Sequence, residues 1–148
     1  PDPLAGYPVQ RLPLPGPLVA PVGVFFTEFL RNRFGYRRVL EAQAWLALTT
    51  GAPRAPVRAS TTVPGQGIVL AGLFLSEDPA MGGLVFPTAP LLDDEDAVRV
   101  PARFNRLVVF DGACWHAPDI AGPGRLAGDV ATGRLVLEAR FVCRRRAS

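Results

Sequence analysis

The residues best suited to chemistry in this chain of 148 residues gather around its single histidine, His116. An imidazole titrates near neutral pH, so His116 is a candidate general acid or base. It closes a segment, residues 103–116, whose pattern predicts a turn, a buried strand, a second turn and then the histidine. Asp111 or Asp119 could orient the ring. The alternative is a structural histidine that is held by hydrogen bonds.

A second set of candidates lies on the clearest strand of the sequence, residues 134–143. Successive side chains of a strand point to opposite faces. The odd-numbered face is apolar and is predicted to pack on the core. The even-numbered face carries Arg134, Glu138 and Arg140. Glu138 could pair with either arginine and move protons, and the arginines could bind an anionic ligand. The alternative is a face that is exposed to solvent.

The basic residues narrow the range of functions. All 16 are arginine, and without lysine the chain offers neither a Schiff-base nucleophile nor a lysine general base. The net charge is +3, and Arg144, Arg145 and Arg146 lie together near the end of the sequence. These three lack the interleaved aromatic residues of a nucleic-acid-binding stripe. We therefore expect no nucleic-acid partner.

The remaining candidate segments point away from metal, redox and membrane functions. The acidic run at residues 93–96 lacks the ligand spacing of a calcium loop and is predicted to be a solvated loop. Cys114 and Cys143 lack CxxC spacing, so buried free thiols are expected, with a disulfide as the alternative. The apolar stretch at residues 18–26 is too short to cross a membrane and is not a convincing signal peptide. A cytoplasmic protein without membrane contact is expected.

The elements that must position these residues are mostly strands. The apolar fraction of 49% suits a domain with a buried core. Residues 39–50 alternate with period two, which favours a strand, although helix is a rival because alanine, leucine and glutamate form helices well. Further strands are expected at residues 68–75, 82–87, 107–110 and 134–143, and loops at residues 51–66, 93–96 and 117–133. Short strands cut by glycine and proline indicate a compact sandwich or barrel.

The N-terminal region reads differently. Seven prolines among residues 1–23 predict an extended arm or a loose terminus, because proline interrupts both helices and central strands. A short helix is expected over residues 24–34, with Thr27 as a candidate cap and Gly35 as its stop.

Three blocks of this sequence resemble the prolyl-hydroxylase-like iron(II)/2-oxoglutarate dioxygenases. Residues 69–76 with residues 81–87 are similar to a strand, a Gly-Gly turn and a strand of that family. Residues 101–116 are similar to the block that ends in the family's second iron-binding histidine. Residues 134–142 resemble the last core strand, where the family places an arginine that binds the far carboxylate of 2-oxoglutarate.

The resemblance spans about residues 39–143 and implies a fold. That fold is mainly β: a double-stranded β-helix, jelly-roll or cupin-like, with one or two N-terminal helices. The expected organisation is a proline-rich arm at residues 1–23, followed by a single double-stranded β-helix domain at residues 24–148.

The iron ligands of that family are incomplete in this chain. The family binds iron with two histidines and one carboxylate, the first pair as His-x-Asp. At the best-placed position this sequence has Arg58-Ala-Ser60, and a guanidinium has no lone pair to give a metal. His116 would be the only ligand left. The resemblance therefore implies a degenerate member that lacks the His-x-Asp ligands.

Three functions follow as hypotheses. The first is a metal-independent, small-molecule biosynthetic enzyme that performs cyclisation, isomerisation or elimination without a cofactor. The second is a non-catalytic pseudo-oxygenase that binds or stabilises a protein partner or forms a homodimer. The third is a true oxygenase with an altered site that uses Fe(II) and 2-oxoglutarate. For the first, His116 and Glu138 are the candidate catalytic residues, and the candidate substrate contacts are Arg58, Ser60, Arg134, Arg140 and Trp115, although Trp115 could simply pack.

Overall fold

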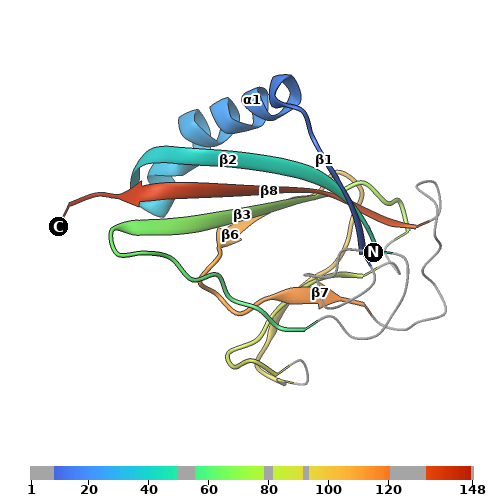
Figure 1. The fold of residues 1–148 in the computed structure, drawn as a ribbon. Coiled ribbons are helices and arrows are strands. Elements are labelled where there is room, and N and C mark those ends of the chain that lie inside the picture. Colours follow the sequence, from blue (N-terminus) through green and yellow to red (C-terminus); the bar gives the residue numbers. More distant parts are fainter. Residues whose placement is uncertain (1–8, 50–55, 79–81, 92–93, 121–132, 148) are drawn as a thin grey trace.

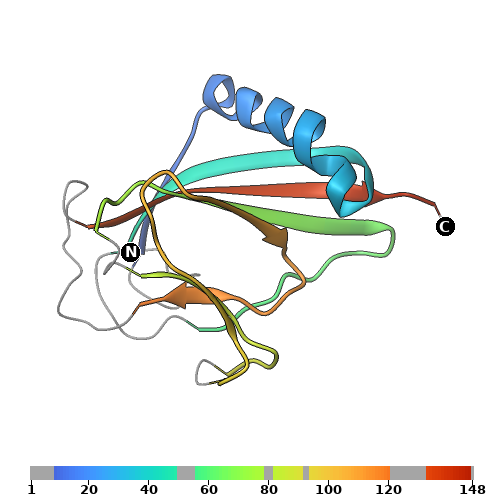
Figure 2. The same cartoon turned by 180° about the vertical axis from the view of Figure 1, so that it is seen from behind.

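Two antiparallel β-sheets face each other in the computed structural model, which describes residues 9–49, 56–78, 82–91, 94–120 and 133–147. The larger sheet has the strand order β1-β2-β8-β3-β6, and the smaller sheet has the order β5-β4-β7 (Figure 1). The strands are β1 (Val9–Pro13), β2 (Tyr36–Thr49), β3 (Gln66–Phe74), β4 (Gly83–Phe86), β5 (Val98–Val100), β6 (Leu107–Asp111), β7 (Ala117–Asp119) and β8 (Arg134–Arg145). Figures 1 and 2 show the helix α1 on one side of the larger sheet and the smaller sheet on the other.

The long strands of the larger sheet agree with the period-two patterns. β2 is a strand, so the rival helix prediction for residues 39–50 is wrong. β8 runs between β2 and β3, and its residue Ala139 lies opposite Ala44 of β2 and Ala71 of β3. β3 is flanked by β8 and β6, which confirms the buried strand predicted there. β6 lies at the edge of the sheet, and Leu107 is exposed, so this strand is less buried than predicted.

The helical region begins eight residues earlier than predicted. α1 spans Gly16–Phe25 and continues into a π-helical turn, η1 (Phe26–Leu30), and a 3₁₀ turn, η2 (Arg31–Phe34). Pro17 lies in the first turn, where proline costs no hydrogen bond. Thr27 lies inside η1 and caps nothing. Gly35 ends the region in the left-handed conformation, with φ of 73°, as predicted.

Aromatic residues hold this helical region on the sheet. The ring of Phe26 stacks on the ring of Phe141 of β8, with centroids 4.1 Å apart and planes 7° apart. Both side chains are buried, together with Tyr36 and Cys143, in the main core cluster. The odd-numbered face of β8 therefore packs against the helical side from Ala139 to Cys143, as predicted. Its even-numbered face is left to point toward the smaller sheet.

Tyr36 is buried with an unsatisfied hydroxyl. Its side chain is 1% exposed, and none of the described residues hydrogen-bonds the hydroxyl oxygen. The ring fits because position 67 is glycine: a Cβ there would lie 1.9 Å from that oxygen. A buried polar group without a partner costs free energy.

Replacing Tyr36 with phenylalanine is expected to leave the free energy of unfolding unchanged or to raise it by about 1 kcal/mol, because the lone hydroxyl is removed and the ring is kept. Urea denaturation of both proteins measures the difference. Gly67→Ala is the matched control and should lower stability, because the new methyl group meets the ring. A clear loss of stability in Tyr36→Phe would mean that the hydroxyl has a partner.

The smaller sheet is built on a pair of glycines. Gly82 has φ of +85°, and a Cβ on Gly83 would lie 1.8 Å from the carbonyl oxygen of Val100, so β4 approaches its neighbours too closely for other residues. The glycine turn and short strand predicted at residues 82–87 are confirmed. β5 was not predicted, and residues 117–119, predicted as loop, form β7 instead. Residues 121–132 of that predicted loop lie outside the described residues.

The other predictions from composition have mixed outcomes. Both cysteines are free thiols; Cys143 is buried as expected, but Cys114 is exposed. Residues 94–96 of the acidic run lie in a turn in which Asp94 accepts hydrogen bonds from Thr88. In the part of the chain that the structure describes, no helix is long and apolar enough to cross a membrane.

Candidate functional site

A cavity of about 210 Å³ lies between the two sheets, and six of the seven predicted site residues line it. Its walls come from β3, β6 and β8 of the larger sheet, from Leu84 of β4 and Pro118 of β7 in the smaller sheet, and from residues 56–60. The predicted residues in the lining are Arg58, Ser60, His116, Arg134, Glu138 and Arg140. Their roles stay predictions, but the fold brings together residues that lie up to 82 positions apart in the sequence.

Arg58 and His116 face each other across an isolated antiparallel bridge. Each backbone N–H donates to the other residue's carbonyl oxygen at 2.9 Å. Side chains of such a directly opposed pair project from the same face, with their Cβ atoms about 5 Å apart. Ser60 follows two residues later on that face, and its N–H donates to the carbonyl oxygen of Gly112 at 2.6 Å. Arg58 and Ser60 thus lie beside His116.

The ring of His116 is oriented by the backbone. Its Nδ1 lies 2.8 Å from the carbonyl oxygen of Cys114, which can only accept, so Nδ1 carries the proton. Nε2 is therefore the nitrogen that remains for chemistry when the ring is neutral. The predicted orienting carboxylates are not used: Asp111 accepts from the N–H of Ala113, and Asp119 pairs with Arg99. The carbonyl oxygen of Cys114, in the turn after β6, orients the imidazole in place of either aspartate.

Burial lowers the pKa of His116 below its usual value of 6.5, because the charged ring loses solvation in the cavity. The hydrogen bond to Cys114 and the charge of Glu138 oppose this shift, whereas the charge of Arg58 adds to it. The lowered pKa favours a neutral imidazole at pH 7, with a lone pair on Nε2. This is the protonation state that a general base needs.

This pKa predicts a pH dependence of stability. An unfolded chain binds the proton at higher pH than the folded chain does, so the free energy of unfolding should fall as the pH drops from about 6.5 through the folded pKa. The only histidine gives a unique proton NMR signal, whose titration measures that pKa directly. Urea denaturation at each pH should show a smaller loss for His116→Gln. A pKa at or above 6.5 in the NMR titration would contradict the prediction.

Glu138 has its partners on neighbouring strands. Its Oε2 accepts a hydrogen bond from Nε1 of Trp45 at 2.5 Å and lies 3.5 Å from Nε of Arg11. The guanidinium of Arg11 also lies over the ring of Trp45, 5.7 Å from its centroid. The even-numbered face of β8 is therefore not simply exposed to solvent. The carboxylate of Glu138 holds Arg11 and Trp45 at the cavity wall.

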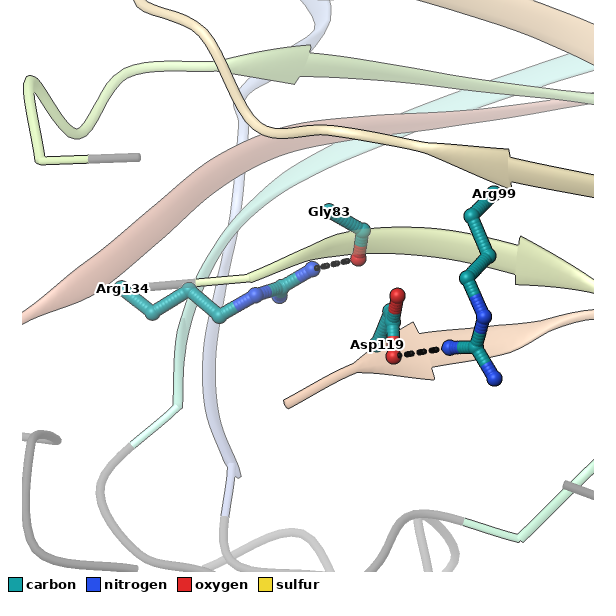
Figure 3. A network of polar contacts seen from close by, with 4 residues as sticks. All are labelled: Gly83, Arg99, Asp119 and Arg134. Carbon is teal, nitrogen blue, oxygen red and sulfur yellow. Dashed lines mark hydrogen bonds and ion pairs between the residues drawn. The ribbon is translucent and has the colours of Figure 1, made fainter. Parts of the chain in front are cut away.

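Arg134 connects the two sheets. Its side chain is 3% exposed, and its guanidinium donates to the carbonyl oxygens of Gly82 and Gly83, at 3.2 and 3.0 Å. Figure 3 shows it extending from β8 to the strand that carries Gly83. Its guanidinium also lies over the ring of Phe74, 5.9 Å from the centroid. Arg134 lines the cavity, but these contacts give it a structural task as well as the binding role that was predicted.

The two remaining candidates lie in different surroundings. Arg140 lines the cavity, and no hydrogen bond or ion pair joins its guanidinium to the other described residues. Trp115 is 38% exposed and is not part of the cavity lining. It precedes His116 in an extended segment, where neighbouring side chains point to opposite sides. The structure thus keeps Arg140 as a candidate and separates Trp115 from the other six.

Sequence reasoning missed two residues of the site, Arg11 and Trp45. Arg11 belongs to β1, within the region predicted to be an arm, and Trp45 belongs to the period-two strand β2. Trp45 lies directly opposite Glu138 in the register of β2 and β8. An aromatic residue with a polar N–H among the aliphatic residues at positions 44–48 is the one signal that could have identified it.

The described residues around His116 do not fit the iron centre of the dioxygenases. That centre needs a second imidazole and a carboxylate beside His116, and the positions next to it hold a guanidinium and a hydroxyl. Within the described ranges, no three histidine, cysteine, aspartate or glutamate side chains gather where they could hold a metal ion.

Solved structures share this fold at low identity. A prolyl-4-hydroxylase from Pseudomonas putida superposes with a TM-score of 0.55 at 20% identity, over 94% of this chain and 72% of its own. HygX from Streptomyces hygroscopicus, with nickel and 2-oxoglutarate bound, gives a TM-score of 0.58 at 15% identity, over 94% of this chain and 71% of its own. Its iron-bound form gives 0.57 at 14%, over 92% and 72%. The chain is thus a double-stranded β-helix, as predicted.

Comparisons of sequence add little. A family described as a family of unknown function (DUF6445) matches residues 95–141, which include β6, His116 and most of β8. No curated protein is similar enough in sequence to count as a relative.

Proposed function

We propose that this chain is a metal-independent enzyme that transforms an anionic small molecule by acid/base chemistry, on an oxygenase scaffold whose metal site is degenerate. The observation that carries the proposal is the pairing of His116 with Arg58 at the cavity wall. It puts a proton-accepting imidazole beside a guanidinium, where the oxygenase motif would need an imidazole and a carboxylate. A biosynthetic role and a cytoplasmic location are part of this proposal.

His116 would act as the base. Its Nδ1–H is held by the carbonyl of Cys114, so Nε2 can take a proton from a C–H or O–H group of the substrate. The resulting imidazolium would return the proton to another atom, which gives an isomerisation, or to a leaving group, which gives an elimination. Attack by the new anion on a double bond of the same substrate would give a cyclisation, in which the double bond opens and the imidazolium protonates the atom that receives the electron pair. The carboxylate of Glu138 would stabilise the imidazolium, because its charge favours a protonated His116.

Two arginines, Arg58 and Arg140, would bind and orient the substrate. The guanidinium of Arg58 lies beside His116, and Arg140 projects from the same face of β8 as Glu138. A planar guanidinium binds a carboxylate through two parallel hydrogen bonds, which fixes orientation as well as position. The negative charge that develops when His116 removes a proton would be stabilised by the same two groups.

An assay in heavy water tests this function with a mixture of compounds, so the substrate need not be identified first. The protein, treated with EDTA, is incubated in D₂O with a metabolite extract of the producing cells, and compounds are followed by mass spectrometry. We expect one compound or a few related ones to take up deuterium or to change in mass, because a proton removed by His116 exchanges with solvent. The rate with His116→Gln should be at least about 100-fold lower.

The matched control is Arg33→Gln, which changes an exposed arginine of η2 that does not line the cavity. It should keep the wild-type rate. The proposal is wrong if no compound changes, or if His116→Gln retains the wild-type rate.

One observation favours the second candidate function, a binding subunit. Apolar side chains lie exposed along α1 and η1: Leu18, Val24, Phe25 and Phe29 are 56%, 55%, 44% and 63% exposed. The rings of Phe25 and Phe29 lie 5.4 Å apart, so part of this surface is continuous. Exposed apolar surface of this kind is typical of protein contacts. Light scattering of wild type and Phe29→Glu tests self-association, which only the wild type should show.

A further inference from the structure

A second hollow, a groove of about 1110 Å³, runs between α1 and the middle of β2. Its walls are mainly small and apolar. The lining residues of this kind are Pro13, Leu14, Gly16, Val19, Ala20, Gly23, Ala42 and Ala44. Two of these residues are joined by a hydrogen bond, in which the N–H of Leu14 donates to the carbonyl oxygen of Ala44 at 2.9 Å.

The groove and the cavity share part of their walls. Four side chains line both: Arg11, Trp45, Arg58 and Arg140. We call these four the junction. Because the same side chains border both spaces, a ligand that lies in the groove can reach the cavity, where His116 lies, through the junction.

The junction is rich in arginine. It contains three guanidinium groups, and among the described residues that line either space the one carboxylate is Glu138. Three guanidinium groups lie where an apolar groove meets the cavity, and Glu138 contacts one of them, Arg11. Such a place attracts an anionic group more strongly than water-exposed surface does, because the walls exclude part of the solvent.

We propose that the groove binds the apolar tail of an amphipathic carboxylic acid, with its carboxylate at the junction and the adjoining carbons beside His116. The apolar walls select the tail, and the arginines select the head. The inference rests on the proposed function, since it names the class of substrate on which His116 would act. Trp45, which lines both spaces, would contact the bound acid where its apolar tail meets its carboxylate.

Calorimetric titration with decanoate tests this assignment, with decanol as the uncharged ligand of equal tail length. Wild type should bind decanoate at least tenfold more tightly than decanol. Arg140→Gln should weaken decanoate binding at least tenfold and leave decanol unchanged. Acetate, which lacks the tail, should show no measurable binding.

Gly23 offers a variant that fills the groove. A Cβ built there lies 3.6 Å from Cβ of Ala42, an ordinary contact, so the helix can accept a side chain at this position. Gly23→Leu should weaken decanoate binding at least tenfold. Val24→Leu is the matched control, because Val24 is exposed and does not line the groove, and it should bind as wild type does. Equal urea midpoints for the two variants confirm that both fold.

The outcomes separate this inference from the proposed function. The assignment of the groove is overturned if decanoate does not bind the wild type. It is also overturned if decanoate binds Gly23→Leu with the same affinity as Val24→Leu. Decanoate binding by the wild type without any deuterium uptake in the D₂O assay leaves the groove in place and removes the catalytic role. Deuterium uptake confined to compounds without an apolar tail keeps the catalytic role and overturns the groove.

Discussion

The double variant Arg58→His with Ser60→Asp is expected to bind Co(II) or Fe(II), with an affinity at least 100-fold above that of the wild type. The bridge to His116 places position 58 directly opposite the existing imidazole, and position 60 on the same face. The two substitutions would supply the second imidazole and the carboxylate that complete a two-histidine, one-carboxylate set. The Nδ1–H of His116 already donates to a backbone carbonyl, as metal-binding histidines usually do.

Calorimetry and the visible spectrum of the Co(II) form measure this gain. Arg58→His alone, without the carboxylate, should bind the metal more weakly than the double variant. Adding His116→Gln to the double variant should abolish the site. If the double variant binds no more metal than wild type, the face-to-face geometry of positions 58 and 116 is wrong.

Replacing Arg134 with methionine is expected to lower the free energy of unfolding by about 3 kcal/mol. Methionine replaces the apolar stem of the buried side chain, but it leaves the carbonyl oxygens of Gly82 and Gly83 without their charged donor. Hydrogen bonds to charged groups contribute about 1.5–3 kcal/mol each, and buried unsatisfied carbonyls add a desolvation cost. The smaller sheet, which these bonds tie to β8, should lose amide exchange protection first.

The matched control is Arg99→Met. Arg99 of β5 forms an ion pair with Asp119 of β7, and both strands belong to the smaller sheet (Figure 3). That pair has N–O contact at 2.7 Å, but the arginine side chain is 49% exposed, so its loss should cost less than about 1 kcal/mol. Urea denaturation compares the two variants. Equal losses would mean that Arg134 is no more important to the fold than a surface ion pair.

The long strands could be predicted because their own side chains report their surroundings. β8 alternates between a face that packs on Phe26 and a face that lines the cavity, and both faces have a distinct composition. The short strands β5 and β7, of three residues each, contain too few residues for a period to be visible. Their existence depends on β4, whose glycines allow close approach of the neighbouring chain.

The start of α1 could not be predicted from propensity. Pro17 and Pro21 argue against a helix, yet both are exposed at its surface, where the carbonyl that loses its partner can face water. Packing of Val19 and Val22 against the core outweighs the local preference. This tertiary contact lies between distant segments, so it leaves no periodic trace near the prolines.

The part of the candidate site that belongs to the family-like motifs could be predicted from the sequence. The contacts made by residues outside those motifs could not. Arg58, Ser60 and His116 were singled out because the resemblance assigns them to the positions of the family's iron ligands, and in the structure Arg58 and His116 face each other across a bridge. The hydrogen bond from His116 to Cys114 and the contact of Arg11 with Glu138 depend on turn geometry and strand order. Both lie beyond what the spacing of residues in the sequence can specify.

Anaerobic calorimetric titration of Fe(II), followed by 2-oxoglutarate, into the wild-type protein tests the central claim most directly. A cavity that places a guanidinium and a hydroxyl beside its one imidazole, where iron would need an imidazole and a carboxylate, should give no stoichiometric heat with either ligand. Tight binding of one iron per chain, followed by a stoichiometric 2-oxoglutarate signal, would contradict the proposal of a metal-independent enzyme and would favour an oxygenase with an altered site.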